Sequence, residues 1–124
     1  MSTTPQFESA IARIETLTTK WSRLMDMSWL SIRHTFNPNF HEEEHLMVAT
    51  TQADWEYRAA VVDWHLPRVC ALQDDTLESV VVHEYCHILN NPLEQQMAKD
   101  WQAPLVEFAC ESVARALMAV HKNG

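Results

Sequence analysis

The spacing of apolar residues predicts a helix at the start of the chain. Between residues 5 and 26, apolar side chains recur every three or four positions, the period of one face of an α-helix. Thr4 and Pro5 precede this stripe as a helix cap and a first-turn proline. The pattern therefore predicts an N-terminal helix over residues 5–26. Its stripe consists of Phe7, Ile11, Ile14, Leu17, Trp21 and Leu24.

The middle of the chain reads as extended. Apolar and polar residues alternate over residues 29–36, as in a half-buried strand. Further strands are predicted over residues 46–51 and 55–66, separated by a turn at 52–54, and Pro67 stops the last of them. Because short turns favour pairing of successive strands in opposite directions, we expect a small, mainly antiparallel three-stranded sheet.

Two helices are predicted after the strands. The first begins at Asp74 or Asp75 and reaches about Leu89, where an Asn-Asn-Pro sequence ends it. Pro104 begins the second, which reaches about Lys122. The order of one helix, three strands and two helices predicts an α+β fold with helices packed on one sheet face. We expect residues 1–124 to form a single domain.

Composition narrows the class of protein. Hydrophobic residues make up 47% of the chain and include five Trp, so a packed core is expected. The net charge of −8 argues against a nucleic-acid surface, which requires clustered Lys and Arg. The sequence shows no secretory signal and no apolar run of the ~18 residues that span a membrane. Three cysteines do not suggest a disulfide framework, so we expect a soluble cytoplasmic protein that binds neither nucleic acid nor membrane.

Two segments, residues 41–45 and 83–87, have the sequence His-Glu-any-any-His. On a helix, the two His lie one turn apart and can bind one zinc ion, while the Glu can take a proton from water. Residues 83–87 lie in a predicted apolar helix that would hold the imidazoles rigidly. Residues 41–45 carry three successive Glu between a turn and a strand, so we interpret them as a solvated loop.

A catalytic zinc also needs a third protein ligand. Gly124 is the only Gly, which excludes the pattern in which a Gly and a third His follow the motif. Glu107 and Glu111 on the last predicted helix can each face the motif if the two helices pack antiparallel. The residue pattern leaves both open, and it also leaves open a buried, hydrogen-bonded His pair without metal.

These residues carry a resemblance to a known family. The motif at 83–87, followed on the next helix by Glu107, resembles the gluzincin arrangement of thermolysin-like metallopeptidases. The order of elements and the chain length resemble the minigluzincins, which have a zincin-like fold. Residues 107–114 are also similar to the Glu-x-x-Ala-Asn helix of small phage- and plasmid-borne metallopeptidases, with Cys110 where these have Asn.

The resemblance implies a metalloendopeptidase that acts on a peptide or protein. In this reading Zn²⁺ is held by His83, His87 and Glu107, and Glu84 is the general base that activates water. The resemblance further implies that the strand within residues 55–66 offers its edge to an extended peptide.

Other side chains have more than one interpretation. Glu111 is expected to orient His83 or His87 through a ring N–H, or else to be an ordinary helix carboxylate paired with Arg115. The sequence does not identify the group that would stabilise the oxyanion. Three residues are candidates, and each can also be interpreted as an ordinary surface or core residue. The candidates are Tyr57, His65 and His121.

The Trp and Cys residues are interpreted chiefly as core. A peptide groove is the alternative for the Trp set, which comprises Trp21, Trp29, Trp55, Trp64 and Trp101. Residues 64–67 are the part of the chain expected nearest to a bound substrate. Cys70, Cys86 and Cys110 are predicted to be buried thiols.

Two competing functions use the same motif. A zinc-stabilised binding module would keep the metal but not the hydrolysis. The second competing function is that of a metal-dependent hydrolase that acts on a non-peptide amide. Peptide deformylases share the helical motif and take a Cys ligand upstream, but Cys70 lacks the Gly-Cys-Leu surroundings expected there.

Overall fold

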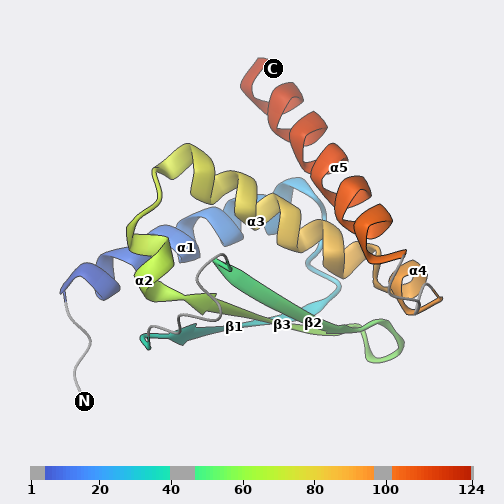
Figure 1. Cartoon of the computed structure of the whole chain (residues 1–124), viewed down its shortest axis with the longest axis horizontal. Helices are drawn as coiled ribbons and strands as arrows, with labels where there is room; N and C mark the ends of the chain where they lie inside the picture. Colours follow the sequence, from blue (N-terminus) through green and yellow to red (C-terminus); the bar gives the residue numbers. More distant parts are fainter. Residues whose placement is uncertain (1–4, 40–46, 97–101, 124) are drawn as a thin grey trace.

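Helices cover one face of a three-stranded sheet, so the predicted α+β class is confirmed (Figure 1). A computed structural model of the chain describes residues 5–39, 47–96 and 102–123. Its elements are α1 (Pro5–Leu24), β1 (Ser31–Asn37), β2 (Ala49–Asp54), the 3-10 turn η2 (Trp55–Tyr57), β3 (Ala59–His65), α2 (Leu66–Cys70), α3 (Asp74–Leu89), α4 (Asn91–Gln96) and α5 (Ala103–Asn123).

The sheet is mixed, so the expectation of a mainly antiparallel sheet is wrong. Its strand order is β1-β3-β2: β1 runs parallel to β3, with Ser31 opposite Ala59, and β2 runs antiparallel to β3, with Ala49 opposite Trp64. The last strand therefore lies between the first two. β3 is the most apolar strand, and the central position buries it while the more polar β1 and β2 form the edges.

The strand boundaries also differ from those predicted. The predicted turn at 52–54 lies inside β2, and the chain reverses instead at η2 and at Arg58, whose φ is 53°. Trp55 and Tyr57 have high strand propensity, which extended the predicted strand too far. Both side chains are exposed, so burial does not hold them in the sheet. β3 consequently begins at Ala59.

Two short helices, α2 and α4, lie where the sequence predicts connections. Pro67 occupies the first turn of α2, where a missing backbone donor costs no hydrogen bond. α4 follows directly after α3 and brings Glu94 close to it. These helices have 5 and 6 residues, too few for an apolar period to show.

α3 is the central helix of the fold and packs against α1, α5 and β2 (Figure 1). Leu77, Val81, Val82 and Tyr85 on this helix are almost completely buried. Val has low helix propensity, so this burial stabilises the helix more than local preference does. The motif at residues 83–87 therefore stands on a rigid support.

A buried carboxylate joins α1 to α3. Glu78 accepts hydrogen bonds from Lys20 Nζ at 2.6 Å and from Trp21 Nε1 at 2.7 Å. Burial alone would raise the pKa of Glu78, but these two hydrogen bonds, together with the charges of Lys20 and His121, hold the pKa below its ordinary value. The contact joins one face of α3 to α1, while His83 and His87 line the cleft beside β2.

The Trp residues divide between core and surface. Trp21 and Trp64 are buried, as predicted, whereas Trp29 and Trp55 are 58% and 46% exposed, so the core prediction is wrong for them. Both exposed residues flank turns, where aromatic residues can contact the fold without being enclosed by it. Trp101 lies outside the described residues.

The three cysteines are free thiols. Cys86 and Cys110 are buried as predicted, and burial raises the pKa of Cys86 to about 12, which makes this thiol unreactive. Cys70 is exposed, so the prediction of a buried thiol is wrong there. It is the last residue of the short α2, and its Sγ lies 3.7 Å from the carbonyl oxygen of Gln6 at the surface.

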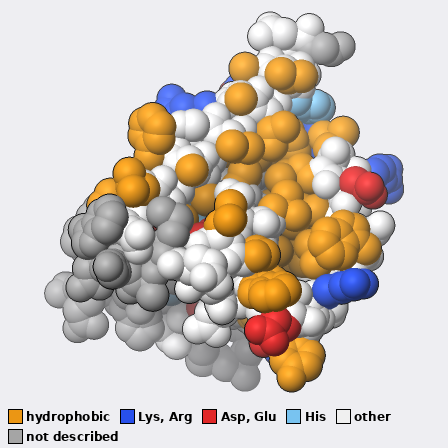
Figure 2. Space-filling view, turned by 90° about the vertical axis from the view of Figure 1, so that its right-hand side faces the viewer, with side chains coloured by type: hydrophobic (Ala, Val, Ile, Leu, Met, Phe, Trp, Pro, Cys, Tyr) orange, Lys and Arg blue, Asp and Glu red, His pale blue; other side chains and the backbone are white. Residues whose placement is uncertain are grey.

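Hydrophobic side chains also gather on one exposed face, over α5 and the elements beside it (Figure 2). On α5, Phe108 is 75% exposed and Val120 is 72% exposed. Even so, no helix in the described part of the chain is long and apolar enough to cross a membrane.

Candidate metal centre

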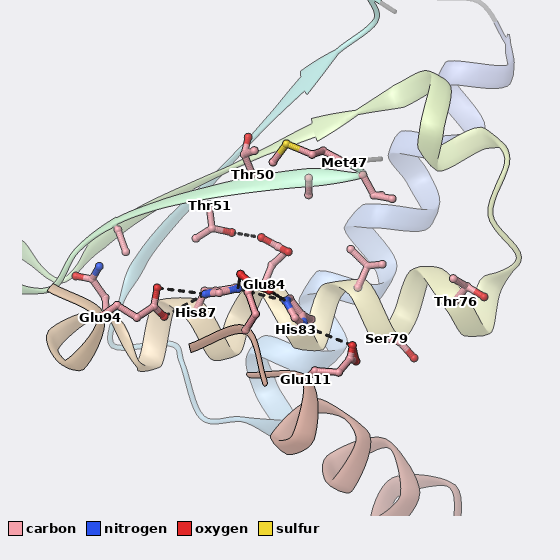
Figure 3. Close-up of a pocket in the computed structure, with 16 residues that line it drawn as sticks. Met47, Thr50, Thr51, Thr76, Ser79, His83, Glu84, His87, Glu94 and Glu111 are labelled. Carbon is pink, nitrogen blue, oxygen red and sulfur yellow. Dashed lines mark hydrogen bonds and ion pairs between the residues drawn. The ribbon is translucent and has the colours of Figure 1, made fainter. Parts of the chain in front are cut away.

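The two motif His side chains point from α3 into the same cleft (Figure 3). One helical turn separates them, and Nε2 of His83 lies 3.2 Å from Nε2 of His87. Their side chains are 18% and 16% exposed, so each imidazole is mostly covered by protein. The helix thus presents two ring nitrogens side by side.

Glu107 brings a carboxylate to both rings from α5. Its Oε2 lies 3.1 Å from Nε2 of His83, and its Oε1 lies 3.1 Å from Nε2 of His87. The packing of α5 against α3 makes this approach possible. The structure therefore brings together the three residues that the sequence singled out as zinc ligands.

The spacing of these donor atoms fits a single small cation. A tetrahedral ion with ligands at about 2.0–2.1 Å holds neighbouring ligand atoms about 3.3 Å apart. The two Nε2 atoms lie 3.2 Å apart, and each lies 3.1 Å from a different oxygen of the Glu107 carboxylate. The Glu107 side chain is 60% exposed, so the group stays open on the side away from α3. Two imidazoles and one carboxylate are a donor set that suits Zn²⁺.

The second nitrogen of His87 faces Glu94 of α4. Nδ1 lies 3.2 and 3.1 Å from the two carboxylate oxygens, which can only accept, so Nδ1 donates. Nε2 of a neutral ring then presents a lone pair to Glu107, an arrangement that requires a cation or a second proton between them. Glu94 is absent from the sequence-based site, because no helix is predicted at 91–96.

Cys110 lies beside the same ring. Its Sγ is 3.6 Å from Nδ1 of His87 and accepts a hydrogen bond of 3.6 Å from Nδ2 of Asn90. His87, Glu94 and Cys110 each offer one donor atom to a second group close enough to share an ion. Burial raises the pKa of the Cys110 thiol, and the nearby carboxylates add to this effect. We therefore interpret this group as support for His87, since Nδ1 already donates to Glu94.

Glu111 lies near both of the partners predicted for it but bonds tightly to neither. Its Oε2 lies 3.8 Å from Nδ1 of His83, and its Oε1 lies 3.7 Å from Nε of Arg115. Both distances exceed that of a good hydrogen bond. Glu111 is therefore an electrostatic neighbour of His83 and of Arg115, and the tighter contact to a motif ring belongs to Glu94.

Glu84 lies next to His83 and lines the same cleft (Figure 3). Its Oε1 accepts a hydrogen bond of 2.6 Å from Oγ1 of Thr51 on β2. Burial raises the pKa of Glu84, and this outweighs the lowering by Thr51 and the two His. The Thr51 contact has no signal in the sequence, because it depends on how β2 packs on α3.

A cleft of about 660 Å³ runs between β2 and α3. β2 contributes Ala49, Thr50, Thr51 and Ala53, and α3 contributes the motif face. Among the described residues that line it, four are Glu and none is Lys or Arg. The cleft is therefore electronegative and would attract a cation.

The strand edge at this cleft is that of β2. β3, which falls within the predicted strand at 55–66, is paired on both sides and has no free edge, so that expectation is wrong. The apolar sequence that identified β3 as a strand is also what places it in the centre of the sheet. In the described part of the chain, β2 pairs with β3 alone.

Several other predicted residues lie away from the cleft. Tyr57 is 80% exposed on η2, His65 is buried at the end of β3, and His121 packs edge-on against Trp21 at 5.3 Å. None of these lines the cleft, nor do residues 64–67. The second match to the motif, at 41–45, lies outside the described residues.

Comparison with known protein families, curated proteins and solved structures finds no match for this chain. The interpretation of the centre therefore depends on its own geometry. Its main features are the contacts of Glu107 with His83 and His87, and the position of Glu84 in the same cleft.

Proposed function

We propose that the chain is a zinc-dependent metallopeptidase with His83, His87 and Glu107 as the ligands. The observation that carries this proposal is the position of Glu107, whose two oxygens each lie 3.1 Å from one imidazole Nε2. Two imidazoles and a carboxylate at these distances match a tetrahedral zinc site with one position left for water.

The chemistry requires one basic group beside the ion. A zinc ion bound here supplies a Lewis acid that polarises a peptide carbonyl and acidifies water. Glu84 accepts the proton of the attacking water and returns it to the leaving amine.

The cleft favours an extended substrate. In the described part of the chain β2 pairs on one side only, and its other edge can hydrogen-bond the backbone of a peptide in β-conformation. Such a peptide would run along β2 and pass Glu84 and the three proposed ligands. Cleavage within a chain bound in this way is the action of an endopeptidase. The four Glu of the lining disfavour acidic residues next to the cleaved bond.

Glu84→Gln tests this function. The variant should retain zinc and lose roughly 10²–10⁴-fold in the hydrolysis of a mixed peptide library, because it keeps the shape but not the base. Glu56→Gln, at an exposed position of η2, is the matched control and should change neither property. A Glu84→Gln variant with wild-type turnover would refute the assignment.

A non-catalytic zinc-stabilised binding module is the second candidate. It is favoured by one observation: in the described residues, none of the candidate oxyanion donors lines the cleft. Under this reading Glu84→Gln alters neither the zinc content nor the affinity for a bound peptide, and the zinc-loaded wild type cleaves no peptide.

A further inference from the structure

Thr51 makes a short contact with the proposed general base. Its Oγ1 donates to Oε1 of Glu84 at 2.6 Å, the distance of a strong hydrogen bond to a charged acceptor. The bond is partly buried, and among the described residues it is the one hydrogen bond that holds this carboxylate. It ties a side chain of α3 to the neighbouring strand.

Thr51 belongs to β2, the strand that lines the cleft. Thr51 pairs with Val62 across β2 and β3, and its side chain lies on the sheet face that packs on α3 (Figure 3). β2 pairs with β3 along one of its edges, and its opposite edge lies along the cleft. One residue thus contacts the base with its side chain and belongs to the backbone that would align a peptide.

We propose that Thr51 is a positioning residue that fixes the Glu84 carboxylate relative to β2. This inference depends on the proposed function only for its effect on catalysis. With Oε1 held by Thr51, Oε2 stays free to accept a proton from water. A bound peptide and the base are then aligned by the same strand, so a small rotation of Glu84 would misplace the proton transfer.

Thr51→Val removes the hydroxyl and keeps the branched shape and the strand preference. In the zinc-loaded protein, kcat should fall roughly 10–100-fold while KM and zinc content stay within about twofold. Thr51→Ser restores a hydroxyl and should recover most of kcat. Thr35→Val is the matched control, because Oγ1 of Thr35 donates to Oδ1 of Asp63 at the same 2.6 Å but in an exposed contact outside the cleft.

A second measurement does not depend on activity. In the zinc-free protein, the Thr51 hydroxyl proton should exchange slowly with water and give a downfield proton NMR resonance. This resonance should disappear in Thr51→Val and persist in Thr35→Val. Its absence from the wild type would overturn the inference.

The two proposals fail in different ways. If zinc-loaded wild type cleaves no peptide but shows the Thr51 hydroxyl resonance, the proposed function fails and the positioning contact stands. If the wild type is active but Thr51→Val keeps its kcat, the positioning role is refuted and the peptidase remains. Loss of zinc or of folding in both Thr51→Val and Thr51→Ser would show a structural role and also refute it.

Discussion

Both carboxylate oxygens of Glu94 lie within hydrogen-bonding distance of Nδ1 of His87, at 3.2 and 3.1 Å. The contact makes Nδ1 the donor and leaves Nε2 to face His83 and Glu107. A carboxylate in this position orients a metal-binding imidazole and increases its basicity. The short helix α4 therefore contributes to the candidate centre without supplying a ligand.

Glu94→Gln should weaken zinc binding by roughly 10–100-fold, because an amide orients the ring less firmly and does not increase its basicity. Competition with a chelator of known affinity measures this change. Glu56→Gln serves as the control at an exposed position. Equal affinity of Glu94→Gln and wild type would show that α4 does not support His87.

Metal content distinguishes the two matches to the motif. Protein purified without added metal should carry about one zinc ion per chain, the number that one set of two His and one Glu can bind. His83→Ala and Glu107→Ala should lose it, whereas His41→Ala should retain it. Elemental analysis measures this ratio, and loss of zinc in His41→Ala alone would move the site to residues 41–45.

His34 should make stability depend on pH. On the inner face of β1, its Nδ1 accepts a hydrogen bond of 3.1 Å from Trp64 Nε1, and its Nε2 lies 3.3 Å from the Tyr85 hydroxyl. Burial lowers the pKa of His34 below 6.5, and Glu15 offsets this only in part. The unfolded chain therefore binds the proton more readily, and stability should fall as the pH drops below about 6.5.

The measurement is the free energy of unfolding of zinc-free protein between about pH 7.5 and 5. His34→Gln, which cannot titrate in this range, should show a smaller loss on acidification than the wild type. The same loss in both proteins would mean that other groups cause the pH dependence.

Leu77 tests how far the core stabilises the motif helix. Its side chain is 0% exposed, so Leu77→Ala should lower the free energy of unfolding by about 2–5 kcal/mol. Leu93→Ala, at a position that is 65% exposed, should change it by no more than about 0.5 kcal/mol. Denaturant titration of both variants measures the difference, and equal effects would contradict the packing described for α3.

Local periodicity accounts for the parts of the fold that the sequence predicts well. α1, α3 and α5 each lie within about two residues of their predicted ends. α1 and α5 carry an apolar stripe and a Pro near their first residue, and α3 is an apolar segment bounded by an Asp pair and by Asn90. α2 and α4 are too short for such a signal, and the aromatic residues of η2 resemble a strand. The sequence misassigns these three segments, and it also predicts a turn at 52–54, where β2 continues.

The sequence by its spacing alone places the two motif imidazoles side by side, since His83 and His87 are one turn apart wherever that helix lies. The residue pattern left Glu107 and Glu111 both open as the third donor, and the resemblance favoured Glu107, whose carboxylate the packing of α5 on α3 brings to both rings. Three features depend on how the elements pack: the edge of β2 at the cleft, the contact of Thr51 with Glu84, and the contact of Glu94 with His87. Strand pairing and contacts between elements join residues far apart in the chain, and no local pattern of hydrophobic and polar positions encodes those distances.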